Sequence, residues 1–331
     1  MLTENGKSGE PILIRPMESN EAELRDNLAY LAYREWAQTR NLPEMADRGR
    51  YGRFQRADCR MMPEQNRFLF CNGLLASTVT IYLWPVRMAG REVLAGLIGN
   101  VATHPDYRGR GYVRMLMDDA KVFMREKGVG VSWLYGALKV YGSSGYEPFE
   151  GYGIISGRNF NQLGKEVEIA PLDMGKDLDE VVRIHDDWNR DVTGPVIRFV
   201  RDWSSRILAK CVRGWDCFHV VRKKGAVIGY GQILPQNTVG EVGAIDATFA
   251  PDVLCALATI SENFLQFGFC CAKLESALRK AAKNVEKRTS TYGLWLLING
   301  EKLGLCEPSG NKEMFDFLKK NEFVYYPSDR F

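Results

Sequence analysis

The residues best suited to chemistry lie in one short turn. Residues 108–111 read Arg-Gly-Arg-Gly and follow an apolar segment that ends near Thr103. The first N–H groups of a helix have no partner within the helix and carry a partial positive charge. Glycines let an anion approach the backbone, and arginines add cationic donors. The turn therefore predicts a phosphate site, although a plain turn with solvated arginines would read the same way.

The elements that must position this turn are a strand before it and a helix after it. A strand is predicted over 92–103. The helix has apolar residues at helical spacing, namely Val113, Leu116, Met117, Ala120 and Phe123. Lys127 and Gly128 are predicted to end it, because a cation suits the negative helix end and glycine adopts the left-handed conformation.

The segment 101–113 resembles motif A of the GNAT (Gcn5-related N-acetyltransferase) superfamily. In that motif an apolar strand and a proline precede Arg/Gln-x-x-Gly-x-Gly/Ala at the start of a helix, and Arg108, Gly111 and Val113 fill the pattern. Val113 departs from the usual small residue, and with Arg114 following it resembles the enhanced-intracellular-survival (Eis) branch. Residues 134–149 resemble a second, later segment of the family. The resemblance covers about residues 11–160 well and the rest weakly.

The resemblance implies an α/β fold with a mixed sheet, in the order βα(α)βββαβαβ. Local signals agree with parts of this order. A strand is predicted at 11–17, followed by a helix that Asn20 caps, with Glu23 in a capping box. The buried face of this helix is predicted at Leu24, Leu28, Leu31 and Ala32. A hairpin turn is predicted at Asn72 and Gly73, and Pro85 and Gly90 mark a further turn. Residues 41–63 show no clear period.

After a polar segment at 159–165 the pattern starts again. The paired segments are 12–17 with 167–173, 68–83 with 217–234, and 101–106 with 246–252. This favours a tandem of two GNAT-like domains, at 1–158 and 166–331. The second copy lacks Arg-Gly-Arg-Gly after Asp252, so we expect a degenerate domain that binds no diphosphate. An unrelated second α+β domain is the alternative.

The amino-acid composition limits the classes of binding partner that we expect. The chain has 331 residues, enough for two domains, and its 45% hydrophobic and 26% charged content is that of a soluble globular protein. A net charge of +3 does not indicate nucleic-acid binding. A solvated face or a substrate rim is the favoured interpretation of the basic strip at Arg48, Arg50, Arg53, Arg56 and Arg60. Eight scattered cysteines without a CxxC pair argue against a metal site. We expect a cytoplasmic protein without a membrane partner; whether it forms homo-oligomers is left open.

The resemblance implies an acetyl-CoA-dependent N-acetyltransferase that transfers an acetyl group to a primary amine of a small molecule or peptide by direct attack on the thioester. The strand edge at Val101 and Thr103 would hold the pantetheine arm, and an N–H near Val101 or Ala102 would bind the thioester oxygen. The implied coenzyme-binding residues are Val101, Ala102, Thr103, Arg108, Gly109, Arg110, Gly111, Tyr112, Val113 and Arg114.

Tyr141 aligns with the tyrosine that Eis-like enzymes use as general acid, with Tyr135 and Tyr146 as rivals. The Eis branch uses its terminal carboxylate as base, which implies Phe331 here. That carboxylate is borne on a third domain, and no such domain is visible in this sequence. Glu147, Glu150 and Asp106 are the alternatives, and His104 is expected to cap or pack instead.

A non-catalytic protein is the competing prediction. The same fold could hold an acyl-CoA as a sensor or assembly module without turning it over. The sequence does not identify the amine acceptor, nor whether the second domain contributes to its site.

Overall fold

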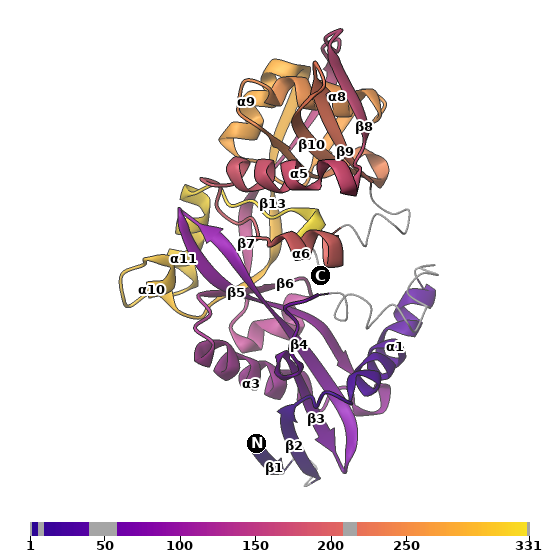
Figure 1. Cartoon of the computed structure of the whole chain (residues 1–331). Helices are drawn as coiled ribbons and strands as arrows, with labels where there is room; N and C mark the ends of the chain where they lie inside the picture. Colours follow the sequence, from indigo (N-terminus) through magenta and orange to yellow (C-terminus); the bar gives the residue numbers. More distant parts are fainter. Residues whose placement is uncertain (1, 6–9, 40–57, 208–216, 330–331) are drawn as a thin grey trace.

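The computed structural model describes residues 2–5, 10–39, 58–207 and 217–329, and within these ranges all strands join one mixed sheet (Figure 1). The predicted mixed α/β fold is confirmed. The elements up to residue 160 are β1 Leu2–Asn5, β2 Pro11–Pro16, α1 Ala22–Thr39, η2 Pro63–Gln65, β3 Asn66–Cys71, β4 Leu74–Met88, β5 Arg91–Thr103, η3 Pro105–Tyr107, α3 Tyr112–Glu126, β6 Val131–Leu134, α4 Leu138–Tyr141, η4 Gly142–Ser144 and β7 Glu147–Phe160. Those after residue 160 are β8 Val167–Pro171, α5 Met174–Trp188, α6 Val200–Asp202, η5 Trp203–Ile207, β9 Cys217–Lys223, β10 Ala226–Leu234, η6 Pro235–Asn237, β11 Thr238–Ala244, α8 Ala250–Thr259, β12 Phe264–Phe267, α9 Ala272–Ala281, β13 Ala282–Leu297, α10 Gly300–Leu303, α11 Asn311–Lys320 and η7 Pro327–Asp329.

Local sequence signals account for the elements around the predicted phosphate turn. α3 starts directly after Gly111 and has Lys127 as its C-cap, followed by Gly128 at φ 73°. Its predicted apolar face is buried in the core. The β3–β4 turn has φ of 51° at Asn72 and 79° at Gly73, the positive values that an Asn-Gly hairpin supplies.

The predicted start of α1 is wrong. The helix begins at Ala22, one residue later than a cap at Asn20 would require, so the capping box with Glu23 does not form at that position. The carboxylate of Glu21 instead accepts hydrogen bonds from the Glu18 backbone N–H and from Arg15. Leu24, predicted to lie on the buried face, is 45% exposed, because its side of the helix borders an open pocket.

The predicted turn at Pro85 is also wrong, because β4 continues through this residue to Met88. The pairing of β4 with β3 ends at Thr80, so the absent N–H of Pro85 leaves no bond to β3 unmade. The Pro85 carbonyl accepts the N–H of Ile197 at 2.8 Å. The chain turns afterwards, at Ala89 and Gly90, both of which have positive φ.

The two halves of the sheet repeat one order of strands. In the first, β2 to β5 are successive antiparallel neighbours and β6 is added parallel to β5. In the second, β8 to β11 follow the same order and β12 is added parallel to β11. The repeat that the sequence pattern predicted therefore extends to topology.

The halves also exchange their long strands. β13 lies between β6 and β7, and β7 lies between β13 and β12, so each half contains a strand from the other (Figure 1). The indole rings of Trp133 on β6 and Trp295 on β13 stack at 4.6 Å between centroids, and both are fully buried. The division at 1–158 and 166–331 stays a prediction; in space the two segments share their central strands.

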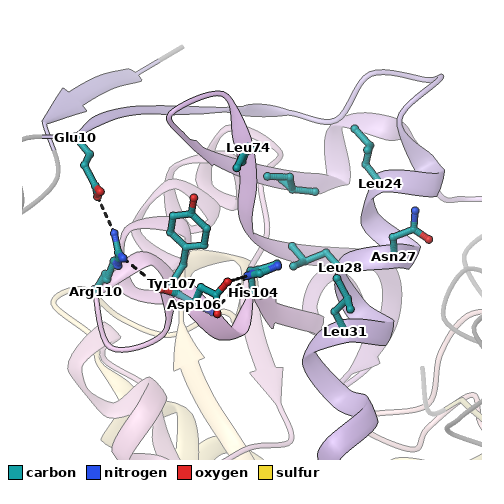
Figure 2. Close-up of a pocket in the computed structure, with 11 residues that line it drawn as sticks. Glu10, Leu24, Asn27, Leu28, Leu31, Leu74, His104, Asp106, Tyr107 and Arg110 are labelled. Atoms are coloured by element: carbon teal, nitrogen blue, oxygen red, sulfur yellow. Dashed lines mark hydrogen bonds and ion pairs between the residues drawn. The ribbon is translucent and has the colours of Figure 1, made fainter.

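β5 separates from β6 before it reaches the phosphate turn. β5 pairs with β6 only through Ala95–Ile98. Asn100 has φ of 46° and sits in a bulge against β4, where the register shifts between Thr78 and Thr80. Residues 99–103 are therefore not paired with β6. Figure 2 shows the loop that follows, at 104–110, facing α1.

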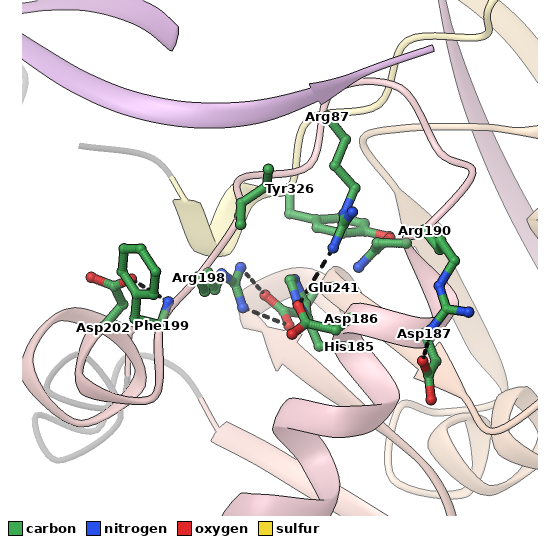
Figure 3. A network of polar contacts seen from close by, with 12 residues as sticks. Arg87, His185, Asp186, Asp187, Arg190, Arg198, Phe199, Asp202, Glu241 and Tyr326 are labelled. Atoms are coloured by element: carbon green, nitrogen blue, oxygen red, sulfur yellow. Dashed lines mark hydrogen bonds and ion pairs between the residues drawn. The ribbon is translucent and has the colours of Figure 1, made fainter. Parts of the chain in front are cut away.

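A buried ionic cluster joins η7 to β11 (Figure 3). The guanidinium of Arg198 pairs with the carboxylates of Glu241 and Asp329 at 2.6 and 2.8 Å, and all three side chains are fully buried. Tyr230 also donates to Glu241. Burial by itself raises the pKa of Glu241, but the charge of Arg198 and its hydrogen bonds lower it overall.

Arg198→Met should therefore destabilise the protein by about 3–5 kcal/mol, because two buried carboxylates lose their counter-charge. Urea denaturation checks this. The matched control is Arg183→Met on α5, whose ion pairs with Glu180 and Asp187 are at the surface and should contribute less than about 1 kcal/mol. Equal losses in the two variants would contradict the role given to the cluster.

The same cluster predicts an acid-sensitive step. Since the folded-state pKa of Glu241 is lowered, its contribution is complete above the unfolded value of about 4.3 and is lost as the pH falls below it. Glu241→Gln cannot ionise, so it should be less stable than wild type at pH 7 but lose less stability between pH 5 and about 3. Urea midpoints at several pH values measure this, and parallel curves for the two proteins would refute it.

Candidate functional site

The turn between β5 and α3 is built around two left-handed glycines. Gly109 has φ of 78° and Gly111 has φ of 85°, a region that other residues adopt at a cost. His104 caps the preceding η3, since its Nδ1 accepts the N–H of Asp106 at 3.3 Å. This is the capping role expected for His104. The turn thus delivers the chain to the N-terminus of α3 without a capping side chain.

The N–H groups from Gly109 to Arg114 have no hydrogen-bond acceptor among the described residues. Within the described ranges none of these six groups donates a hydrogen bond, and the first bond of the helix is from Met115 to the carbonyl of Gly111. A concentration of free N–H groups at a helix start attracts anions. This arrangement suits a phosphate or diphosphate.

The arginines of the turn are held by carboxylates. Arg108 donates to the carbonyl of Ala32 on α1 at 2.9 Å and lies 3.9 Å from the carboxylate of Glu35. Arg110 pairs with Glu10 at 2.8 Å, and this hydrogen bond raises the pKa of Arg110. Arg114 is exposed. An incoming anion would therefore compete with Glu10 and Glu35 for these two cations.

The free edge of β5 meets α1 at Tyr33. The Tyr33 hydroxyl donates to the carbonyl of Val101 at 2.5 Å, so this carbonyl already has a partner on the strand edge where we predicted the pantetheine arm. The Ser77 hydroxyl donates to the carbonyl of Ala102 and lies 2.9 Å from the hydroxyl of Thr103. Sequence analysis missed Tyr33, because nothing in the spacing of α1 shows which strand its hydroxyl reaches.

Of the three tyrosines considered as acid, Tyr141 alone has a hydroxyl without a hydrogen-bond partner among the described residues. Tyr146 is buried in the core and its hydroxyl lies 2.6 Å from that of Ser132. The Tyr135 hydroxyl donates to that of Tyr292. Burial raises the pKa of Tyr141 to about 12.

Gly136 makes room for the ring of Tyr141. A Cβ at this position would lie 2.4 Å from the Tyr141 Cε2 atom, closer than real side chains approach. The short α4 therefore holds Tyr141 against a position that tolerates only glycine in this geometry.

No base stands out among the candidates. Phe331 lies outside the described residues. Glu147 accepts a hydrogen bond from Asn311, Glu150 is exposed, and the carboxyl of Asp106 is 84% exposed beside the phosphate turn. The assignment of the base stays open.

A carboxylate lies just ahead of the corresponding helix start in the second half. Asp246 accepts hydrogen bonds from the N–H groups of Thr248 and Phe249 ahead of α8, at 2.7 and 3.4 Å, and its bond from the Thr248 hydroxyl lowers its pKa the most. A carboxylate in this place repels another anion. The expected loss of diphosphate binding in the second half stays a prediction, and the carboxylate of Asp246 supports it.

A pocket of about 420 Å³ lies beside the phosphate turn (Figure 2). It is enclosed by α1, the start of β4 and residues 104–110. The lining residues are Glu10, Leu24, Asn27, Leu28, Leu31, Leu74, Leu75, His104, Asp106, Tyr107 and Arg110.

One group of metal-ligand type occurs within the described ranges, formed by Asp58, Cys59 and Asp202. Its carboxylates already have partners: Asp58 accepts from the indole of Trp84, and Asp202 pairs with Arg60. The expectation of a metal-free protein stays a prediction. None of the helices described has the length and apolar character needed to cross a bilayer.

Comparisons with known proteins agree with this architecture. Residues 20–149 match the family model described as an acetyltransferase (GNAT) domain. No curated protein matches the sequence.

Three solved structures share the fold over most of the chain. A probable N-acyltransferase from Enterococcus faecalis V583 has 16% identity and a TM-score of 0.65, over 88% of this chain and 74% of that one. A GCN5-related N-acetyltransferase from Kribbella flavida has 15% identity and a TM-score of 0.63, over 88% and 72%. Eis1 from Mycobacterium abscessus has 16% identity and a TM-score of 0.58, over 87% and 73%. Residues 20–149 therefore match a GNAT acetyltransferase domain, and most of the chain shares the fold of these three structures.

Proposed function

We propose that the protein transfers an acetyl group from acetyl-CoA to a primary amine of a small molecule or peptide. The single observation that carries this proposal is the run of six N–H groups at residues 109–114 that have no partner among the described residues, next to the part of β5 that no longer pairs with β6. The first feature suits the diphosphate of the coenzyme, and the second suits its amide-bearing arm.

The reaction needs a neutral amine at the thioester carbon. The amine nitrogen attacks the carbonyl, the new C–N bond forms, the C–S bond breaks, and the sulfur leaves as a thiolate that takes a proton. A backbone N–H near Val101 or Ala102 is our candidate for the oxyanion donor, because the bulge at Asn100 interrupts the pairing with β4 and this part of β5 is not paired with β6.

Tyr141 is our candidate for the proton donor. Its hydroxyl makes no hydrogen bond within the described ranges, and a pKa of about 12 keeps it protonated through neutral pH. A developing thiolate supplies the acceptor that the hydroxyl lacks. The base that removes the proton from the amine is not assigned.

The competing function is acyl-CoA binding without turnover. It is favoured by the two arginines that carboxylates hold and by the lack of an evident base. Thiol release on mixing acetyl-CoA with a panel of primary amines separates the two functions. Release that depends on both reactants supports the enzyme; coenzyme binding without release from any amine supports the binding module.

Arg108→Ala with Arg110→Ala should weaken acetyl-CoA binding by at least about tenfold per arginine, because each removes a cation beside the diphosphate. Isothermal titration measures this. Arg125→Ala is the matched control, since it removes the same charge from the exposed, opposite end of α3. Wild-type affinity in the double variant would remove the phosphate site.

Tyr141→Phe should lower kcat by roughly 100-fold with little change in coenzyme affinity, as expected for loss of a general acid. Tyr135→Phe serves as the control, because its hydroxyl is engaged with Tyr292. In wild type, ionisation of Tyr141 should not reduce kcat below about pH 11, since its pKa lies near 12. Steady-state kinetics at several pH values test both points, and equal kcat in Tyr141→Phe and wild type would dismiss the acid role.

A further inference from the structure

The pocket beside the phosphate turn has an apolar interior with an open mouth (Figure 2). Leu24, Leu28 and Leu31 line it from one face of α1, at the i, i+4 and i+7 spacing of a helix. Leu24 is 45% exposed and Leu74, on the β3–β4 turn, is 62% exposed. Covering these leucines with an apolar body of a ligand would remove them from water.

The polar groups of the pocket are mainly acceptors. Among the described lining residues, Glu10 and Asp106 contribute two carboxylates and Arg110 contributes one guanidinium. The Oδ1 atom of Asn27 is buried and has no hydrogen-bond partner within the described ranges. An anionic ligand would meet three acceptors, whereas a protonated amine would be attracted to the carboxylates.

We propose that this pocket binds an amphiphilic organic cation, an ammonium carried on an aromatic or alkyl body. The ammonium pairs with Glu10 at one end of the pocket, and the body packs on the leucines of α1 at the other. Figure 2 shows these two ends, with the ring of Tyr107 between them.

The site is coupled to the phosphate turn through Arg110, which belongs to both. Arg110 is held by Glu10 at 2.8 Å and by the carbonyl of Asp106 at 3.3 Å. An ammonium that shares the carboxylate of Glu10 weakens this hold and leaves Arg110 available to a coenzyme phosphate. Cation and coenzyme should therefore strengthen each other's binding, since such coupling is reciprocal. This coupling rests on the proposed function; the binding of the cation does not.

The probe is protonated N,N-dimethyl-2-phenylethylamine, a tertiary amine that cannot form a stable amide and so is no acceptor. Its comparators are 3-phenylpropanol and 3-phenylpropionate, which are neutral and anionic. By isothermal titration at pH 7 the cation should bind at least about tenfold more tightly than either comparator. Equal affinity for the three compounds would overturn the proposal.

Two variants locate the cation. Leu31→Trp should abolish its binding by filling the apolar end, and Glu10→Gln should weaken it about tenfold by removing the counter-charge. The matched control is Glu64→Gln, which removes a partly exposed carboxylate that pairs with Lys127 outside this pocket. Circular dichroism confirms that each variant is folded; binding that survives in folded Leu31→Trp, or that is weakened equally by Glu64→Gln, would refute the site.

Coenzyme A tests the coupling. At saturating coenzyme A the affinity of wild type for the cation should rise about threefold or more, and Arg110→Ala should lose this increase. An unchanged affinity in wild type would refute the coupling alone. If wild type binds no coenzyme A, the proposed function fails, and the titrations with the three compounds still decide on the pocket.

Discussion

The first turn of α3 presents backbone N–H groups that no other part of the described chain satisfies. Such groups are costly to leave unpaired, so the surrounding structure must keep them at the surface, where water or an anion can reach them. The left-handed glycines 109 and 111 do this by bringing the chain to the helix start without a capping side chain. The bulge at Asn100 also contributes, because beyond it the end of β5 no longer pairs with β6.

The second half shows the opposite outcome from the same topology. Just ahead of α8 the carboxylate of Asp246 accepts the backbone N–H groups of Thr248 and Phe249. The two helix starts therefore differ in local charge, although the strands around them follow the same order. The order of strands does not by itself decide whether such a position attracts an anion, because a nearby carboxylate opposes the attraction.

Much of the first half could be predicted from short-range patterns. The limits of α3, the turn at Asn72 and Gly73 and the role of His104 follow from residues within a few positions of one another. The errors have a different origin. Leu24 is exposed because of a pocket formed by distant segments, and Pro85 is tolerated in β4 because β3 has already ended there.

The candidate site likewise contains parts that local sequence patterns predict and parts that they do not. Motif residues 101–114 lie together where their spacing indicated. The contact of Tyr33 with Val101 and the ion pair of Arg110 with Glu10 join residues 68 and 100 positions apart, respectively, and local pattern carries no information at that range. The room that Gly136 leaves for Tyr141 likewise depends on packing that no spacing shows.

The exchange of long strands sets the order in which the chain can mature during synthesis. β6 and β7 emerge early from the ribosome, but the partner that separates them, β13, comes more than a hundred residues later. Until then their edges offer unmade hydrogen bonds to any neighbouring chain, which is the usual route to misassembly. The nascent protein therefore depends on β13 to cover the edges of β6 and β7 that face each other across it in the finished sheet.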